Sequence, residues 1–178
     1  MYGDNKPRLN EIQSEIDNHM AKYIEDDFKL KLAHDKTLKP FLTERDKIIA
    51  GFSKEQKKEF YNSIVQNFEA LAEFFPVKAD GTSDLSFIKS FVAEYVEPYK
   101  MRVAMELYEN EYIENQKLEK IINLFDEEPE LTKIIWKNEK GSCLMFDFFE
   151  NSDDDFEAFD IFYEFYIDML FFANFDLE

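Results

Sequence analysis

Aromatic rings and carboxylates alternate almost without a break in residues 143–168, which read CLMFDFFENSDDDFEAFDIFYEFYID. Acids are the only charged residues in this stretch, and four of them recur at spacings of three and four: Glu157, Asp160, Glu164 and Asp168. On a helix this spacing places the carboxylates on one face. A continuous acidic face attracts and steers a basic protein. The stretch therefore predicts a surface that presents fixed negative charge to a basic partner.

Other chemistry is less well supported by the residue pattern. The spacing of EF-hand calcium ligands is matched by Asp153, Asp155, Glu157 and Glu164. However, Ala158 stands where the tight turn of that loop needs Gly. Cys143, the only cysteine, lies among apolar residues with no histidine nearby, which favours a buried thiol over a nucleophile. Nothing isolates two carboxylates in an apolar pocket, so we expect no catalytic residue, no metal site and no cofactor.

The negative charge of the chain is concentrated in its C-terminal part. The formal net charge of the 178 residues is −18. Residues 1–105 hold 18 acids and 16 bases, whereas residues 106–178 hold 21 acids and 5 bases. Such a polyanion repels the phosphates of nucleic acid and the surface of an anionic membrane. We therefore expect a basic protein partner, with no direct binding to nucleic acid or membrane.

The sequence carries no segment typical of export or membrane insertion. The first residues, MYGDNKPRLN, form no apolar signal segment. No apolar run approaches the roughly 18 residues that a membrane-spanning helix needs. A single cysteine cannot form an internal disulfide, which favours a reducing compartment. We therefore expect a soluble intracellular protein.

An apolar stripe at helical spacing begins after Pro7. Its members, with one residue from the more charged part that follows, are Leu9, Ile12, Ile16, Met20, Tyr23 and Leu30. Pro40 could kink one long helix or separate two shorter ones. A continuous helix over residues 8–50 would be about 65 Å long, too long for the rest of the chain to cover. Its exposed stripe would then predict pairing with a second copy of the chain.

The remaining elements predict an α+β fold. Ser53 and Gln56 form a capping box that opens a second helix, which we expect to reach Phe75. Four segments with β-forming residues follow, and we expect them to form a four-stranded antiparallel sheet: residues 87–96, 100–108, 117–124 and 132–136. The apolar run 143–149 fits either a strand or a helix. Residues 156–173 predict a final helix.

Several short segments occur in a recognisable order. Residues 38–45, LKPFLTER, precede Ile48-Ile49, and residues 101–115, MRVAMELYENEYIEN, precede Leu118 and Lys120. Residues 134–137, IIWK, and 144–149, LMFDFF, come next, with acids after them. These segments and their order resemble the nucleosome assembly protein (NAP/SET) family of histone chaperones. Phe60-Tyr61, in the expected second helix, is similar to a Phe-Trp pair of the same family.

The resemblance implies a long N-terminal dimerisation helix, residues 1–51, followed by an α/β lobe of the type called an earmuff, residues 52–178. It further implies a homodimer that binds core histones on an acidic concave surface in the nucleus and cytoplasm, without catalysis. The dimer interface is then expected at Leu9, Ile12, Ile16, Met20, Tyr23 and Leu30. The expected histone-binding acids are Glu150, Asp153, Asp154, Asp155, Glu157, Asp160 and Glu164. An acidic scaffold or inhibitor that binds a basic non-histone partner is the alternative.

Overall fold

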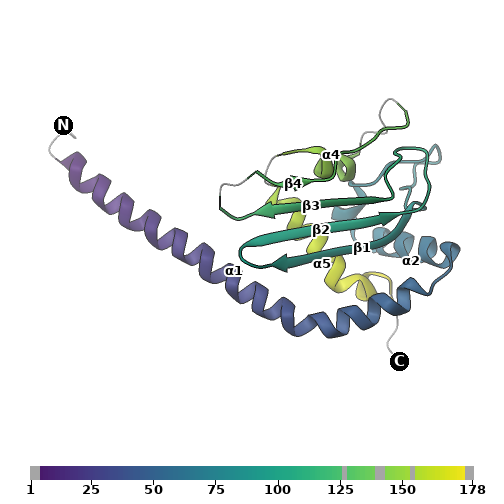
Figure 1. The fold of residues 1–178 in the computed structure, drawn as a ribbon, viewed down its shortest axis with the longest axis horizontal. Coiled ribbons are helices and arrows are strands. Elements are labelled where there is room, and N and C mark those ends of the chain that lie inside the picture. Colours follow the sequence, from purple (N-terminus) through teal and green to yellow (C-terminus); the bar gives the residue numbers. More distant parts are fainter. Residues whose placement is uncertain (1–4, 126–127, 139–142, 153–154, 175–178) are drawn as a thin grey trace.

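A single long helix, α1 (Lys6–Ala50), leads into an α/β lobe in the computed structural model (Figure 1). The structure describes residues 5–125, 128–138, 143–152 and 155–174. Pro40 lies inside α1, so the helix is continuous and the alternative of two shorter helices is wrong. A proline removes one backbone N–H bond and bends a helix. Contacts with the lobe support this part of α1, including the ion pair of Lys39 with Glu94 at 2.8 Å.

The capping box opens the second helix, α2 (Lys54–Asn67), as the sequence predicts. The Gln56 backbone N–H donates to Ser53 Oγ at 3.2 Å, and the Ser53 N–H donates to Gln56 Oε1 at 2.8 Å. The expected continuation to Phe75 is wrong, because the chain breaks at Phe68 before the short helix α3 (Glu69–Ala72). Phe68 stacks on Phe172 with ring centroids 4.4 Å apart. The interruption of the helix therefore allows Phe68 to stack on a ring of the last helix.

Four antiparallel strands form one sheet in the order β1-β2-β3-β4. Their bounds are Ile88–Val96, Lys100–Leu107, Lys117–Asn123 and Glu130–Leu131. The first three strands confirm the predicted segments, but the predicted fourth strand at 132–136 is wrong. Thr132 still bonds to β3, since its N–H donates to the Glu119 carbonyl at 2.9 Å. Beyond it the chain leaves the sheet edge and bonds to the loop before β3, where the Glu114 N–H donates to the Ile135 carbonyl at 2.8 Å. Trp136 forms an isolated bridge with Ile113 in the same loop.

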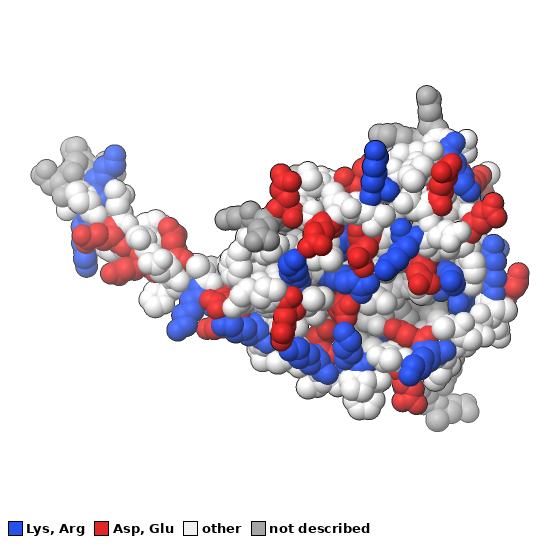
Figure 2. Space-filling view, in the orientation of Figure 1, with Lys and Arg blue, Asp and Glu red and all other residues white. Residues whose placement is uncertain are grey.

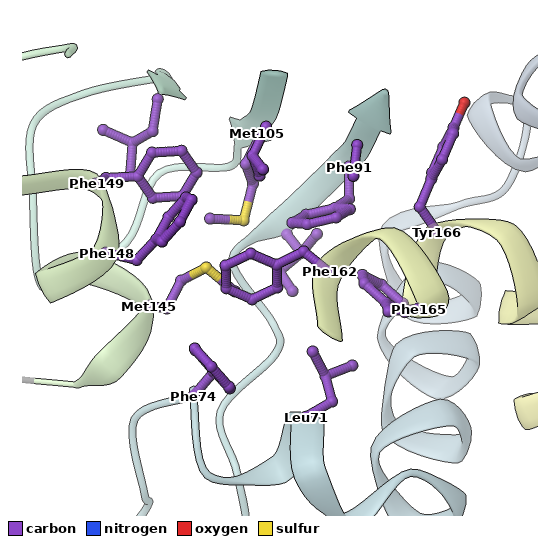
Figure 3. Close-up of a cluster of buried hydrophobic side chains, with 14 of the residues drawn as sticks. Leu71, Phe74, Phe91, Met105, Met145, Phe148, Phe149, Phe162, Phe165 and Tyr166 are labelled. Atoms are coloured by element: carbon purple, nitrogen blue, oxygen red, sulfur yellow. The ribbon is translucent and has the colours of Figure 1, made fainter. Parts of the chain in front are cut away.

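Two helices cover the inner face of the sheet. The run 143–149 resolves as a helix, α4 (Leu144–Glu150), and the final helix α5 (Phe156–Phe172) agrees with the prediction. Figure 3 shows Phe148 of α4 and Phe162 of α5 meeting Phe91 and Met105 of the sheet in one aromatic core. The core also includes Phe74, whose ring lies 4.8 Å from that of Phe162. Because the rings fill one face of α5, its acids are left on the other.

None of the helices in the part of the chain that the structure describes is long and apolar enough to cross a membrane. The longest, α1, is instead rich in charged residues along its whole length.

Candidate acidic binding surface

Helix α5 holds a row of exposed carboxylates over the aromatic core. Its buried residues include Phe159, Phe162 and Phe165. The acids that the spacing predicts on the other face, Glu157, Asp160, Glu164 and Asp168, are all exposed. Within the described ranges, no ion pair involves any of these four side chains. The row is therefore free to receive cations from a partner.

The remaining predicted acids occupy different positions. Asp155 is the N-cap of α5, where its carboxylate accepts a hydrogen bond from the Ala158 N–H at 3.1 Å. Glu150 ends α4 and accepts a hydrogen bond from the Trp136 indole N–H at 3.1 Å. Asp153 and Asp154 lie outside the described residues. Asp155 and Glu150 therefore each accept a hydrogen bond within the lobe.

A buried lysine fixes the end of α4 beside these acids. Lys120 of β3 is fully buried, and its ammonium donates hydrogen bonds of 3.0 Å to the carbonyls of Phe148 and Asn151. It also lies 4.5 Å from the centre of the Phe148 ring. These contacts satisfy carbonyls that the helix end leaves unpaired. Lys120 stands between the inward-facing Leu118 and Ile122, and this alternation is the sequence signal for its burial.

An open groove of about 640 Å³ lies where α3, α4 and the first turns of α5 meet. Two of its acids, Asp155 and Glu157, belong to the predicted set. Three more, Glu69, Glu73 and Asp147, were not predicted as site residues. Glu69 and Glu73 belong to α3 and its C-cap, whereas Asp147 belongs to α4, so no local spacing connects the first two acids to the third. The excess of acid in residues 106–178 gave no signal for Glu69 and Glu73, which lie outside that part of the chain.

The outer face of the sheet, by contrast, is balanced in charge. Arg102 of β2 lies between two carboxylates, 2.7 Å from Glu94 and 2.6 Å from Glu119. Burial alone raises the pKa of Glu94, but hydrogen bonds from Lys39 and Arg102 hold it below its ordinary value. Figure 2, which views this face, shows Lys and Arg interspersed with Asp and Glu. A strongly basic partner is therefore attracted less to this face than to the α5 side.

The apolar stripe of α1 lies largely outside the lobe, along the part of the helix that projects from it (Figure 1). All six residues predicted for the dimer interface are exposed, from 39% for Ile12 to 71% for Leu30. The exposed apolar residues continue to Phe41 and Ile48, which lie seven residues apart and were not part of the predicted interface. A spacing of seven keeps two residues on nearly the same side of a helix. The stripe therefore runs along almost the whole of α1.

The remaining candidate chemistry is structural. Cys143 is buried, and desolvation raises the pKa of its thiol to about 11, which suppresses the reactive thiolate. Among the described residues, no group of three or more His, Cys, Asp or Glu side chains is arranged to hold a metal ion. Asp153 of the calcium alternative lies outside those residues.

Solved structures share this fold over nearly the whole chain. Nucleosome assembly protein S from Plasmodium falciparum matches with a TM-score of 0.57 and 18% identity, covering 94% of this chain and 99% of that one. Nucleosome assembly protein 1 from Plasmodium knowlesi matches with a TM-score of 0.53 and 16% identity, covering 94% and 95%. A nucleosome assembly protein of a malaria parasite matches with a TM-score of 0.54 and 16% identity, covering 98% and 90%. The chain has the nucleosome assembly protein fold.

Sequence comparison finds a relative that is similar to this chain over most of its length. It is 33% identical over 159 residues to an uncharacterised protein of Encephalitozoon cuniculi, a match that covers 89% of this chain and 87% of the relative. The chain belongs to the same family as that protein. No family model matches the sequence.

Proposed function

We propose that this protein is a histone chaperone that binds basic core histones on the acidic surface of its lobe and assists nucleosome assembly without catalysis. The observation that carries the proposal is the row of exposed carboxylates on α5. The row belongs to a chain with the fold of the nucleosome assembly proteins. The net charge of −18 adds long-range attraction for a basic partner. As part of the same proposal, we place the protein in the nucleus and cytoplasm.

The proposed mechanism is competition for the positive charge of the histone. The carboxylates of α5 are fixed by a packed aromatic core, so they present charge without first having to be ordered. A histone held on them is shielded from nonspecific contact with DNA. The phosphates of DNA compete with the carboxylates for the Lys and Arg side chains of the histone. The histone is released where its attraction to DNA is stronger than its attraction to the carboxylates. Because the acids are exposed, added salt screens them beyond about 8 Å at physiological ionic strength and weakens the complex.

The proposal includes a homodimer formed through α1. The apolar stripe runs from Leu9 to Ile48, and its members remain exposed although the lobe contacts α1 from Glu25 onward (Figure 1). A second copy of α1 would bury it by helix-to-helix packing. Pairing brings two lobes into one particle, and in the proposed arrangement their acidic sides form the walls of one concave surface. Two linked surfaces bind a histone complex more tightly than either alone.

Charge reversal on α5 tests the binding surface. We expect Asp160→Lys with Glu164→Lys to weaken binding of labelled core histones by about tenfold or more in a fluorescence anisotropy titration, because two attractive charges become repulsive. The matched control is Glu55→Lys with Glu59→Lys, an exposed pair of the same spacing on α2. Both variants change the net charge equally. Equal effects of the two variants, or none from the α5 pair, would show that the α5 row is not the binding surface.

A further inference from the structure

The groove between α3, α4 and α5 combines charge and apolar surface in a way that the exposed α5 row does not. Its acids are Glu69, Glu73, Asp147, Asp155 and Glu157, and no Lys or Arg is among its lining residues. Within the described parts of the chain, none of the five forms an ion pair. Asp155 accepts a hydrogen bond from the Ala158 N–H as the N-cap of α5. Cations from outside the molecule therefore meet little competition here.

The floor of the groove is apolar. The term floor denotes here the apolar residues of its lining, and the term walls the acidic ones; the apolar residues are Ala70, Phe74, Leu144, Phe148, Ala158 and Ile161. Leu144 is 48% exposed, although it is a large aliphatic side chain at the start of α4. Burying such a side chain against a partner removes apolar surface from water and so favours binding. A purely ionic partner would leave this surface in water.

The segments that form the groove are connected by a hydrogen bond and by ring packing, so the groove is formed before a partner binds. The Met145 N–H at the start of α4 donates to the Phe74 carbonyl after α3 at 2.9 Å. The rings of Phe74 and Phe148 both pack on Phe162 of α5, with centroid distances of 4.8 and 4.9 Å. Figure 3 shows these three rings in one cluster of the core, from the segment after α3, from α4 and from α5. A preformed groove reduces the entropy lost on binding.

We infer that this groove docks a short segment of the basic partner in which Lys or Arg side chains flank an apolar side chain. The apolar side chain contacts Leu144 and Ile161 on the floor, and the cations pair with carboxylates on both walls. The volume of about 640 Å³ falls within the range of about 300–1,000 Å³ that is typical of ligand pockets. This inference rests on the proposed function, since it assigns to the basic partner a specific anchoring segment. It predicts affinity that salt weakens only in part.

Two labelled peptides separate this mixed recognition from simple charge attraction. The probe is a short fluorescein-labelled peptide of Lys, Leu and Ala, and its match carries Ser in place of each Leu. We expect the Leu peptide to bind the full chain at least about tenfold more tightly at high salt, where ionic attraction is screened. Equal affinity of the two peptides across the salt series would overturn the inference, because the apolar floor would then contribute nothing.

Variants on the walls and the floor place the binding site. Glu69→Lys with Glu73→Lys is expected to weaken the Leu peptide by about tenfold or more, whereas the Glu55→Lys and Glu59→Lys control changes it much less. Leu144→Ser, at a half-exposed position, is expected to weaken the Leu peptide by about threefold to tenfold and leave the Ser peptide unchanged. Circular dichroism confirms that each variant is folded. An effect of the control equal to that of the wall variant would place the peptide outside the groove.

The same variants distinguish the groove from the proposed function. Asp160 and Glu164 do not line the groove. If Asp160→Lys with Glu164→Lys abolishes histone binding while Glu69→Lys with Glu73→Lys changes neither histone nor peptide binding, the groove inference is wrong and the chaperone proposal stands. If the wall and floor variants weaken the Leu peptide but the wild-type chain does not bind core histones, the groove inference stands and the histone proposal is wrong.

Discussion

At the scale of single residues, Lys120 connects the sheet to the acidic surface. A fully buried ammonium is costly unless it is paired and hydrogen-bonded. Here it reaches two carbonyls at the end of α4, Phe148 and Asn151, so a side chain of β3 sets where that helix stops. Asn151 lies between Glu150 and the N-cap Asp155. The position of two predicted acids therefore depends on a residue on the opposite side of the core.

Replacing Lys120 tests this role. We expect Lys120→Met to lower the free energy of unfolding by about 1–3 kcal/mol, because the methionine keeps the apolar stem but leaves buried carbonyls without their donor. Urea denaturation followed by the fluorescence of Trp136 measures the change. Lys117→Met, at an exposed position of the same strand, is the control and should stay within about 0.5 kcal/mol of the wild type. A Lys120→Met protein as stable as the wild type would show that the buried bonds are dispensable.

At the scale of elements, α1 is fastened to the lobe at its C-terminal part. The Arg45 guanidinium donates to the carbonyls of Tyr166 and Ile167 near the kink of α5 at Asp168, and it lies 4.6 Å from the centre of the Tyr166 ring. Farther along, Asp35 of α1 is buried and accepts a hydrogen bond from the Tyr163 hydroxyl at 2.9 Å. These contacts hold one end of α1, while the other end projects with its apolar stripe exposed.

Aspartates on the stripe test whether α1 forms the dimer. Size-exclusion chromatography with light scattering should give a dimer mass for the wild type and a monomer mass for Ile16→Asp with Met20→Asp, because charges in an apolar helix interface are desolvated without partners. Both residues are about half exposed in the single chain, so the lobe should stay folded. The matched control, Ser14→Asp with Asn18→Asp, adds the same charges on the other side of α1 and should remain dimeric. A monomeric wild type would refute the dimer.

Elements whose pattern depends on nearby residues were predictable from the sequence. The capping box at Ser53 and the alternation of Met101, Val103 and Met105 depend only on local backbone geometry, and both appear in the structure as expected. The predicted end of the second helix and the predicted position of the fourth strand were wrong, because contacts with residues distant in the sequence determine them. The helix ends at Phe68, which stacks on Phe172. The residues after Thr132 bond to the loop before β3 and not to the sheet edge.

At the scale of the whole molecule, the fold separates charge-balanced surface from acidic surface. Most bases of the N-terminal part lie on α1 and the outer sheet face (Figure 2). There, Lys39 and Arg102 pair with Glu94. Helices α4 and α5, on the other side of the sheet, carry no Lys or Arg and six exposed acids: Asp147, Glu150, Glu157, Asp160, Glu164 and Asp168. A partner that is steered by charge therefore approaches the helical side.

This uneven charge should make stability depend on salt. Clustered carboxylates repel one another and destabilise the compact state. We expect the melting temperature to rise by about 2–4 °C between low and physiological salt, equivalent to about 1 kcal/mol for a chain of this length. Differential scanning calorimetry in sodium chloride measures this shift. The Asp160→Lys and Glu164→Lys variant relieves part of the repulsion and should show a smaller rise. A melting temperature that falls with salt would show that the ion pairs of the sheet dominate instead.

The sequence by itself determined the features that are set over a few residues. These are the helical carboxylate row, the apolar stripe that begins after Pro7 and the alternating strands, because backbone geometry fixes which side chains share a face at a given spacing. Only the tertiary structure decided what distant segments build together. The groove joins Glu69 and Glu73 to Asp147 and Glu157, and the burial of Lys120 defines the end of α4. Such proximity arises from packing of the aromatic core, which no local spacing encodes.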